Sequence, residues 1–165
     1  MRSADEWFEA YGESHQNPVN KKIHWVCVPL ILVSLVGLLW ELRLPINLEG
    51  EVGGVATGEL ANAGMLLLFL SLSYYAMISR PLAIGMTIVA YLSILGVFGI
   101  KMLSTTLNLS LWQGALMIFI LAWIGQFIGH KIEGKKPSFF EDLQFLMIGP
   151  LWLLGFIYRR FKIGY

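Results

Sequence analysis

Five stretches of this sequence contain no Asp, Glu, Lys or Arg, and they restrict what the chain can fold into. They cover residues 23–40, 60–79, 81–100, 102–130 and 143–158. A helix that rises about 1.5 Å per residue needs about 20 apolar residues to cross a hydrocarbon core of about 30 Å. Only 14% of the residues are charged, against about 25% in a typical soluble domain. The chain is therefore predicted to be an integral membrane protein.

Four of these stretches predict transmembrane helices, which run over about Ile23–Trp40, Ala61–Ile78, Leu82–Ile100 and Leu111–Gly129. The fifth, Leu143–Tyr158, contains Gly149-Pro150, and a proline inside a helix removes a backbone donor and breaks or kinks it. We expect this broken segment to be re-entrant or interfacial. The predicted fold class is an all-α polytopic membrane helix bundle. It forms a single integral membrane domain over residues 1–165, with an interfacial N-terminal segment over residues 1–22.

The loop charges predict the orientation, because Lys and Arg collect in cytoplasmic loops. Basic residues border one side of the predicted crossings, at Lys21, Lys22, Arg80, Lys131, Lys135 and Lys136. The segment between the first two crossings is instead acidic, with Glu41, Glu49, Glu51 and Glu59. We expect both termini to be cytoplasmic, in the inner membrane of a bacterium or the endoplasmic reticulum membrane of a eukaryote. A formal net charge of +1 gives no indication of a nucleic-acid partner.

The chain has three histidines, and all of them are predicted to lie at the cytoplasmic face. His15 and His24 border the first crossing, and His130 ends the fourth. Tyr11 and His15 share one face of a short N-terminal helix. Asn17-Pro18 is typical of a helix start, with Asn as the cap and Pro in the first position. The resulting turn could bring His15 back toward His24, which lies one helical turn beyond Asn20.

A second polar cluster lies at the end of the fourth crossing. Gln126, His130 and Glu133 occupy positions i, i+4 and i+7, so they form one stripe on an otherwise apolar helix. Such a stripe is costly inside a membrane unless it is paired, binds a metal or faces a cavity. Gly125 and Gly129 leave room beside it for a second helix.

The types of side chain limit the metal that this site can hold. Neutral imidazoles with an oxygen donor suit Fe(II) or Zn(II), and Cys27, the only cysteine, rules out a cysteine-based cluster. Three histidines are too few for the paired histidine boxes of membrane di-iron hydroxylases, so we expect a mononuclear centre. Iron would leave positions for O2 and a chelating substrate, whereas zinc would hold a hydrolytic water.

The two clusters resemble a small family of membrane 2-hydroxy-fatty-acid dioxygenases first characterised in fungi. The resemblance runs from about Trp7 to Tyr158. It includes Tyr11, His15, Asn17-Pro18, Asn20 and His24, and the later Gln126 to His130 segment with Glu, basic residues and Pro behind it. It implies an Fe(2+)-dependent α-oxidation, in which O2 converts a long-chain 2-hydroxy fatty acid to the acid one carbon shorter. Glu133 and Pro137 follow His130 one residue sooner than in the fungal members.

The resulting hypothesis assigns a role to each residue. His15, His24 and His130 bind iron. Gln126, Asn20 or Glu133 supplies a further ligand or a supporting hydrogen bond. Tyr11 joins these three as a candidate catalytic residue, and Lys135 or Lys136 guides the substrate carboxylate or only marks the cytoplasmic side.

Two alternatives stay open, a zinc-dependent membrane lipid hydrolase and a non-enzymatic membrane lipid-binding or scaffold protein. Membrane lipid is a further expected partner, and a homo-oligomer is compatible with the sequence.

Overall fold

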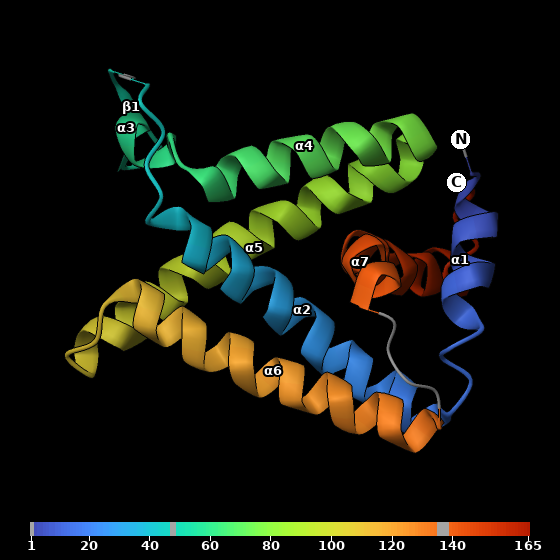
Figure 1. Ribbon diagram of the computed structural model, residues 1–165. Coiled ribbons are helices and arrows are strands. Elements are labelled where there is room, and N and C mark those ends of the chain that lie inside the picture. The colour runs from blue at the N-terminus through green and yellow to red at the C-terminus, as the bar shows by residue number, and fades with distance from the viewer. Residues whose placement is uncertain (1, 47–48, 135–138) are drawn as a thin grey trace.

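The computed structural model describes residues 2–46, 49–134 and 139–165, which form an all-α bundle (Figure 1). The predicted fold class is therefore confirmed. The helices are α1 (Ala4–Gly12), α2 (Pro18–Trp40), α3 (Thr57–Leu60), α4 (Ala63–Ile78), α5 (Arg80–Thr106), α6 (Leu111–Glu133) and α7 (Phe139–Arg160). Two short strands, β1 (Glu51–Val52) and β2 (Val55–Ala56), form an antiparallel hairpin before α3.

Local capping explains where the helices begin. Ser3 and Glu6 form a reciprocal capping box at the start of α1. At the start of α2, the Asn17 side chain accepts a hydrogen bond from the Val19 amide at 2.8 Å, and Pro18 holds the first position. The predicted break at Asn17-Pro18 is thus confirmed, and it turns the chain sharply from α1 into α2.

Helices α2 and α6 pack side by side in opposite directions (Figure 1). A Cβ built on Gly125 would lie 2.5 Å from the Cys27 sulfur, and a Cβ on Gly129 would overlap the Asn20 side chain. The predicted close approach of another helix at both glycines is confirmed. It brings the first turns of α2 against the last turns of α6.

Within the described residues, α2, α5 and α6 are long and apolar enough to cross a membrane. The other expected crossing, α4, has 16 residues, which span about 24 Å at about 1.5 Å per residue. Large apolar side chains cover the outside of the bundle, such as Phe69, Ile88 and Leu121, whose exposed fractions are 60 to 66%. An apolar surface of this extent is typical of a protein that contacts lipid.

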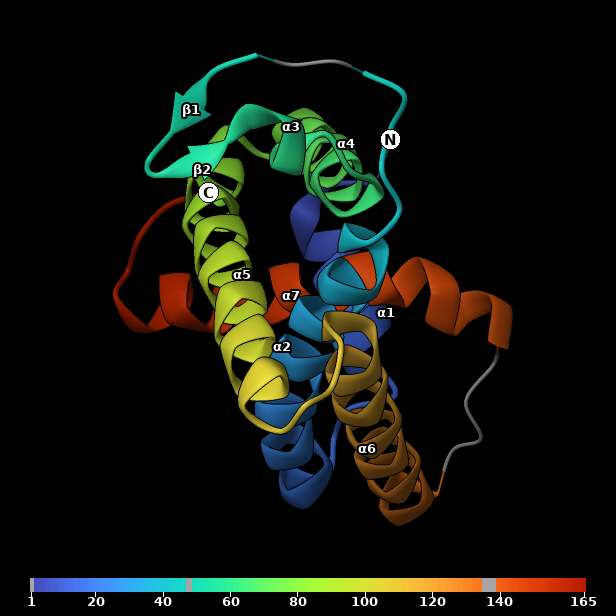
Figure 2. The same cartoon turned by 90° about the vertical axis from the view of Figure 1, so that its left-hand side faces the viewer.

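The fifth apolar run differs from the expectation, because α7 is one continuous helix that passes through Pro150. Residues 148–155 are buried on every side. A helix enclosed in this way is stabilised mainly by packing, which offsets the hydrogen bond lost at the proline. Helix α7 lies across the long helices and does not run parallel to them (Figure 2).

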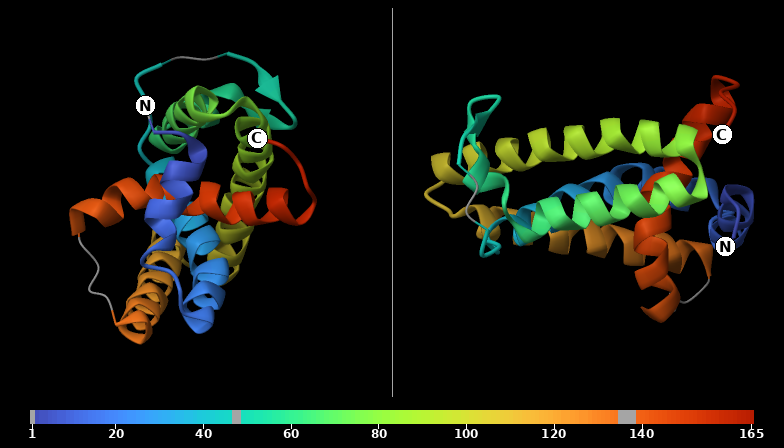
Figure 3. Two further views of the ribbon diagram at one scale, coloured as in Figure 1. Left: turned by 90° about the vertical axis from the view of Figure 1, so that its right-hand side faces the viewer. Right: turned by 90° about the horizontal axis from the view of Figure 1, so that it is seen from above.

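Helix α1 covers the outside of α7 (Figure 3). Phe8 and Tyr11 are buried, and a Cβ on Gly155 would lie 2.7 Å from the Phe8 ring. The apolar face of α1 therefore packs on protein, where the sequence predicted contact with the bilayer. The last residue, Tyr165, donates its hydroxyl to the Asp5 carboxylate at 3.0 Å, so the two ends of the chain lie together.

Candidate metal centre

Three histidine side chains converge where α2 begins and α6 ends. His15 lies in the turn between α1 and α2, His24 lies in the second turn of α2, and His130 lies in the last turn of α6. One ring nitrogen from each lies within 4.8 Å of the other two. His15 Nε2 and His24 Nε2 lie 2.8 Å apart. The structure thus brings together the histidines that the sequence places at one membrane face.

Backbone carbonyl oxygens lie within hydrogen-bond distance of the Nδ1 atoms of two of these rings. His15 Nδ1 lies 2.6 Å from the Tyr11 carbonyl oxygen, and His24 Nδ1 lies 2.9 Å from that of Asn20. A carbonyl oxygen only accepts, so each ring donates from Nδ1 and, when neutral, presents a lone pair at Nε2. Two lone pairs then face each other, an arrangement that a cation would stabilise. Metal-binding histidines are commonly oriented by this kind of hydrogen bond.

Burial keeps the His15 ring neutral. Its side chain is 2% exposed, and desolvation lowers the pKa of His15 from 6.5 to about 4, although the hydrogen bond to the Tyr11 carbonyl acts in the opposite direction. Neutral imidazole is the form that binds a metal. The donor set therefore fits Fe(II) or Zn(II) without the loss of a proton from this ring.

An aromatic wall fixes the orientation of the His15 ring. Tyr11 stacks on it with ring centroids 4.1 Å apart and planes inclined by 6°. Trp152 of α7 contacts both rings. Its ring centroid lies 4.9 Å from that of Tyr11 and 5.4 Å from that of His15. The predicted proximity of Tyr11 and His15 is confirmed. The contact with Trp152 has no signal in the local sequence, because it depends on how α7 crosses the bundle.

Glu133 joins the end of α6 to the turn that carries His15. Its carboxylate accepts hydrogen bonds from the Gln16 amide at 2.7 Å, the Asn17 amide at 3.0 Å and Asn20 Nδ2 at 2.9 Å. These contacts favour a supporting role for Glu133 over a role as a metal ligand. The hydrogen bond from Asn20 Nδ2 to Glu133 also fixes the orientation of the Asn20 amide group.

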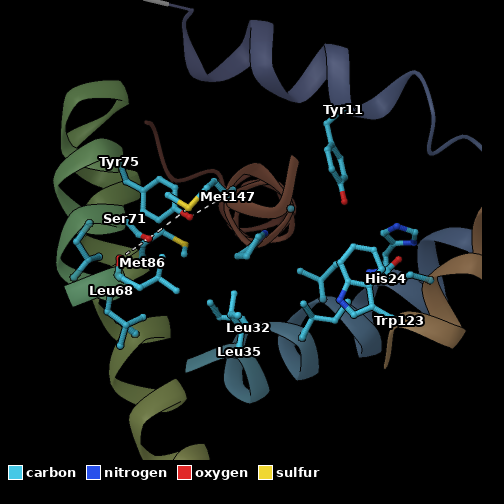
Figure 4. A pocket seen from close by; sticks show the side chains of 18 of the residues that line it. Tyr11, His24, Leu32, Leu35, Leu68, Ser71, Tyr75, Met86, Trp123 and Met147 are labelled. Atoms are coloured by element: carbon cyan, nitrogen blue, oxygen red, sulfur yellow. Dashed lines mark hydrogen bonds between the residues drawn. The ribbon is translucent and has the colours of Figure 1, made fainter. Parts of the chain in front are cut away.

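A cavity extends from the histidines into the bundle (Figure 4). The cavity volume is about 90 Å³. Both His24 and His130 line it, together with Tyr11, Trp123 and Gln126. Figure 4 shows Leu68, Ser71, Tyr75 and Met86 of α4 and α5 on the side opposite His24 and Trp123. The cavity therefore has one end rich in nitrogen ligands and one mainly apolar end.

Several residues that line this cavity were not predicted from the sequence. Trp123 could have been found, because it precedes Gln126 by three residues and His130 by seven and so lies on the same helical stripe. Tyr75 and Met147 come from distant segments, and the Tyr75 hydroxyl donates to the Met147 carbonyl at 2.7 Å. Lys135 and Lys136 lie outside the described residues.

The fold and the site together define an all-α membrane bundle with a histidine cluster at the polar end of an apolar cavity. The Mpo1-like family, described as 2-hydroxy-palmitic acid dioxygenase Mpo1-like, matches residues 1–161. The chain belongs to this family. No curated protein and no solved structure gives a significant match.

Proposed function

We propose that the protein is an Fe(II)-dependent dioxygenase that converts long-chain 2-hydroxy fatty acids to the fatty acid one carbon shorter. The family match supports this substrate class and reaction. The observation that carries the proposal is the pair of Nε2 atoms of His15 and His24, which face each other at 2.8 Å while both Nδ1 atoms contact carbonyls. With His130 they form a three-nitrogen site on an amphipathic cavity.

The histidines would hold the iron, and the Tyr11 and Asn20 carbonyls would keep the His15 and His24 rings in the binding orientation. Bound Fe(II) would supply chelation of the substrate carboxylate and 2-hydroxyl, and activation of O2. The Tyr11 ring, which stacks on His15, and the Trp152 ring, which is tilted against Tyr11, would limit the access of water to this end of the cavity.

The lining of the cavity, polar at one end and mainly apolar at the other, suits an amphipathic acid. A carboxylate and a 2-hydroxyl at the histidine end would leave the acyl chain to extend toward Leu68 and Met86, where burial of each methylene contributes about 0.8 kcal/mol. With O2 as the only oxidant, the balanced products are the shortened acid, carbon dioxide and water. Both oxygen atoms of O2 are consumed, and the bond that breaks joins the carboxyl carbon to the hydroxyl-bearing carbon.

We also propose that the histidine cluster faces the cytoplasm. The Tyr158 hydroxyl donates to the Pro81 carbonyl, so the end of α7 lies beside the α4–α5 turn. The basic residues at the histidine end of the bundle are Lys21, Lys22, Arg80, Lys131, Arg159 and Arg160. At the other end Lys101 pairs with Glu59 at 3.7 Å. An excess of Lys and Arg at one end indicates the cytoplasmic side.

The test combines metal analysis with product analysis on the purified full-length protein. Protein loaded with Fe(II) should convert 2-hydroxypalmitate to pentadecanoic acid with equimolar O2 consumption. His15→Ala, His24→Ala and His130→Ala should lose both iron and product, whereas Lys131→Ala, beside the cluster, should keep both. Absence of bound iron, or full conversion by His130→Ala, would contradict the proposal. Bound zinc, with O2-independent cleavage of an amide-linked lipid, would instead indicate a hydrolase.

A further inference from the structure

Two residues of α6 that line the cavity each carry a buried polar atom that has no hydrogen-bond partner. Within the described ranges, these are the indole nitrogen Nε1 of Trp123 and the amide oxygen Oε1 of Gln126. The Gln126 side chain is 6% exposed. Leaving such groups unpaired is unfavourable, because water no longer satisfies them. Since both residues line the cavity beside His24 and His130, a bound molecule can satisfy them.

The other polar side chains of the cavity differ in this respect. At the apolar end, the Ser71 hydroxyl donates to the Leu67 carbonyl at 2.7 Å, and the Tyr75 hydroxyl donates to the Met147 carbonyl. At the histidine end, Nδ1 of His24 contacts the Asn20 carbonyl. Apart from the His24 Nε2 lone pair assigned to the metal, the unpartnered polar atoms found in the described part of this cavity therefore belong to Trp123 and Gln126, next to the candidate metal centre.

The chemistry of the two atoms selects their partners. An indole N–H only donates, so its partner must be an acceptor, whereas Gln126 Oε1 needs a donor. An ionised 2-hydroxy acid has several acceptors on its carboxylate but a single donor, the 2-hydroxyl. The 2-hydroxyl is then the only group that can donate to Gln126, and the carboxylate, whose oxygens only accept, is assigned to Trp123.

We propose that Trp123 and Gln126 are the specificity-determining residues for the polar head of the substrate. Trp123 binds the carboxylate, and Gln126 accepts the hydrogen bond of the 2-hydroxyl and so distinguishes a 2-hydroxy acid from the plain fatty acid. This inference rests on the proposed function. An unhydroxylated acid would leave Gln126 Oε1 buried and unpaired, which should weaken its binding about tenfold or more.

Ligand binding to the metal-free full-length protein tests this assignment, with calorimetric titration in detergent as the readout. The probes are 2-hydroxyhexadecanoic acid, hexadecanoic acid and hexadecanol. The wild-type protein should prefer the hydroxy acid over the plain acid by about tenfold. Gln126→Met, which keeps the size but removes the acceptor, should abolish this preference. Gln126→Leu serves as a second variant if the first fails to accumulate as folded protein.

Trp123→Phe should weaken both acids to a similar extent and leave hexadecanol unaffected, because the alcohol has no carboxylate. Gln113→Met and Trp112→Phe are matched controls, since they lie near the other end of the same helix and outside the cavity. Equal binding of the two acids by wild-type protein, or a preference retained by both Gln126 variants, would overturn the proposal. So would a loss of iron from Gln126→Met, which would make Gln126 a metal ligand.

The outcomes for the two proposals can be separated. If 2-hydroxypalmitate is never oxidised but the Gln126-dependent preference in binding remains, the proposed reaction fails and the recognition of the head group stands. If 2-hydroxypalmitate is oxidised but Gln126→Met prefers the hydroxy acid over the plain acid as strongly as wild type does, the proposed reaction stands and the recognition of the head group by Gln126 fails.

Discussion

Glu133 Oε2 lies 2.9 Å from Asn20 Nδ2, so the last residue of α6 is hydrogen-bonded to the first turn of α2. The same carboxylate also accepts hydrogen bonds from the Gln16 and Asn17 amides. These are the residues that directly follow His15. The contact therefore controls where the His15 ring lies relative to His24 and His130.

Replacing Glu133 with Gln should weaken this connection while preserving its shape. The neutral amide loses the charge assistance to three N–H donors, and because the carboxylate is partly exposed we expect a loss of about 1 kcal/mol in unfolding free energy. That corresponds to a fall of about 2 to 4 °C in unfolding temperature for a chain of this size. Thermal unfolding followed by circular dichroism measures it. Glu41→Gln, at the other end of the bundle, is the control, and an equal effect there would contradict the prediction.

Removal of metal should lower stability through the histidine cluster. A ligand that binds only the folded state at about 100 times its dissociation constant adds about 2.7 kcal/mol, or roughly 5 to 10 °C in unfolding temperature. Chelator treatment should remove this increment from wild type. His130→Ala should show the same unfolding temperature with and without added Fe(II) under anaerobic conditions. A metal-dependent shift that survives in His130→Ala would exclude this residue as a ligand.

The packing of α1 on α7 predicts opposite effects for two glycine substitutions. A Cβ on Gly155 would lie 2.7 Å from the rigid Phe8 ring, whereas a Cβ on Gly99 in α5 would meet no atom within 4 Å. Gly155→Ala should therefore cost about 1 to 3 kcal/mol from overpacking. Gly99→Ala should add about 0.5 to 1 kcal/mol, because alanine favours a helix. Denaturant or thermal unfolding of both variants tests the contrast, and a stabilised Gly155→Ala would rule out the tight contact.

The apolar end of the cavity should set the acyl chain length. Ala90 is buried and lines the cavity on α5, so Ala90→Leu adds volume where the end of the chain would lie. We expect the preferred 2-hydroxy acid to become shorter by about two carbons, since each methylene contributes about 1 kcal/mol to discrimination. The measurement is kcat/KM over a series of chain lengths. Ile88→Leu, which is exposed on the same helix, is the control and should leave the chain-length preference unchanged. An unchanged preference in Ala90→Leu would show that the acyl chain does not reach Ala90.

Much of the candidate site follows from short-range patterns. Asn20 and His24 are one turn apart, as are Gln126 and His130, so helical geometry alone places each pair on one face. Asn17-Pro18 indicates the turn that returns His15 to His24, and the structure has both the cap and the contact. These features depend on a few neighbouring residues and on helix periodicity.

Helix α7 could not be predicted in the same way. Gly149-Pro150 indicates a break when the segment is considered alone, but its neighbours enclose it: Tyr11 lies against Gly149, and Phe8 lies against Gly155. Trp152 reaches His15 only because α7 crosses the bundle at this depth. Contacts between segments more than a hundred residues apart decide the structure here, and no local pattern encodes them.

The order of the histidines along the chain has a consequence for how the protein is made. His15 and His24 leave the ribosome at the start of synthesis, but His130 returns to them only when α6 has been inserted beside α2. The His15 and His24 rings therefore lack the third ligand, and their nitrogen atoms stay available to water or to other metals, until most of the membrane domain is in place. The three-nitrogen site exists only in the assembled bundle, so any ion that it holds must be acquired after membrane insertion.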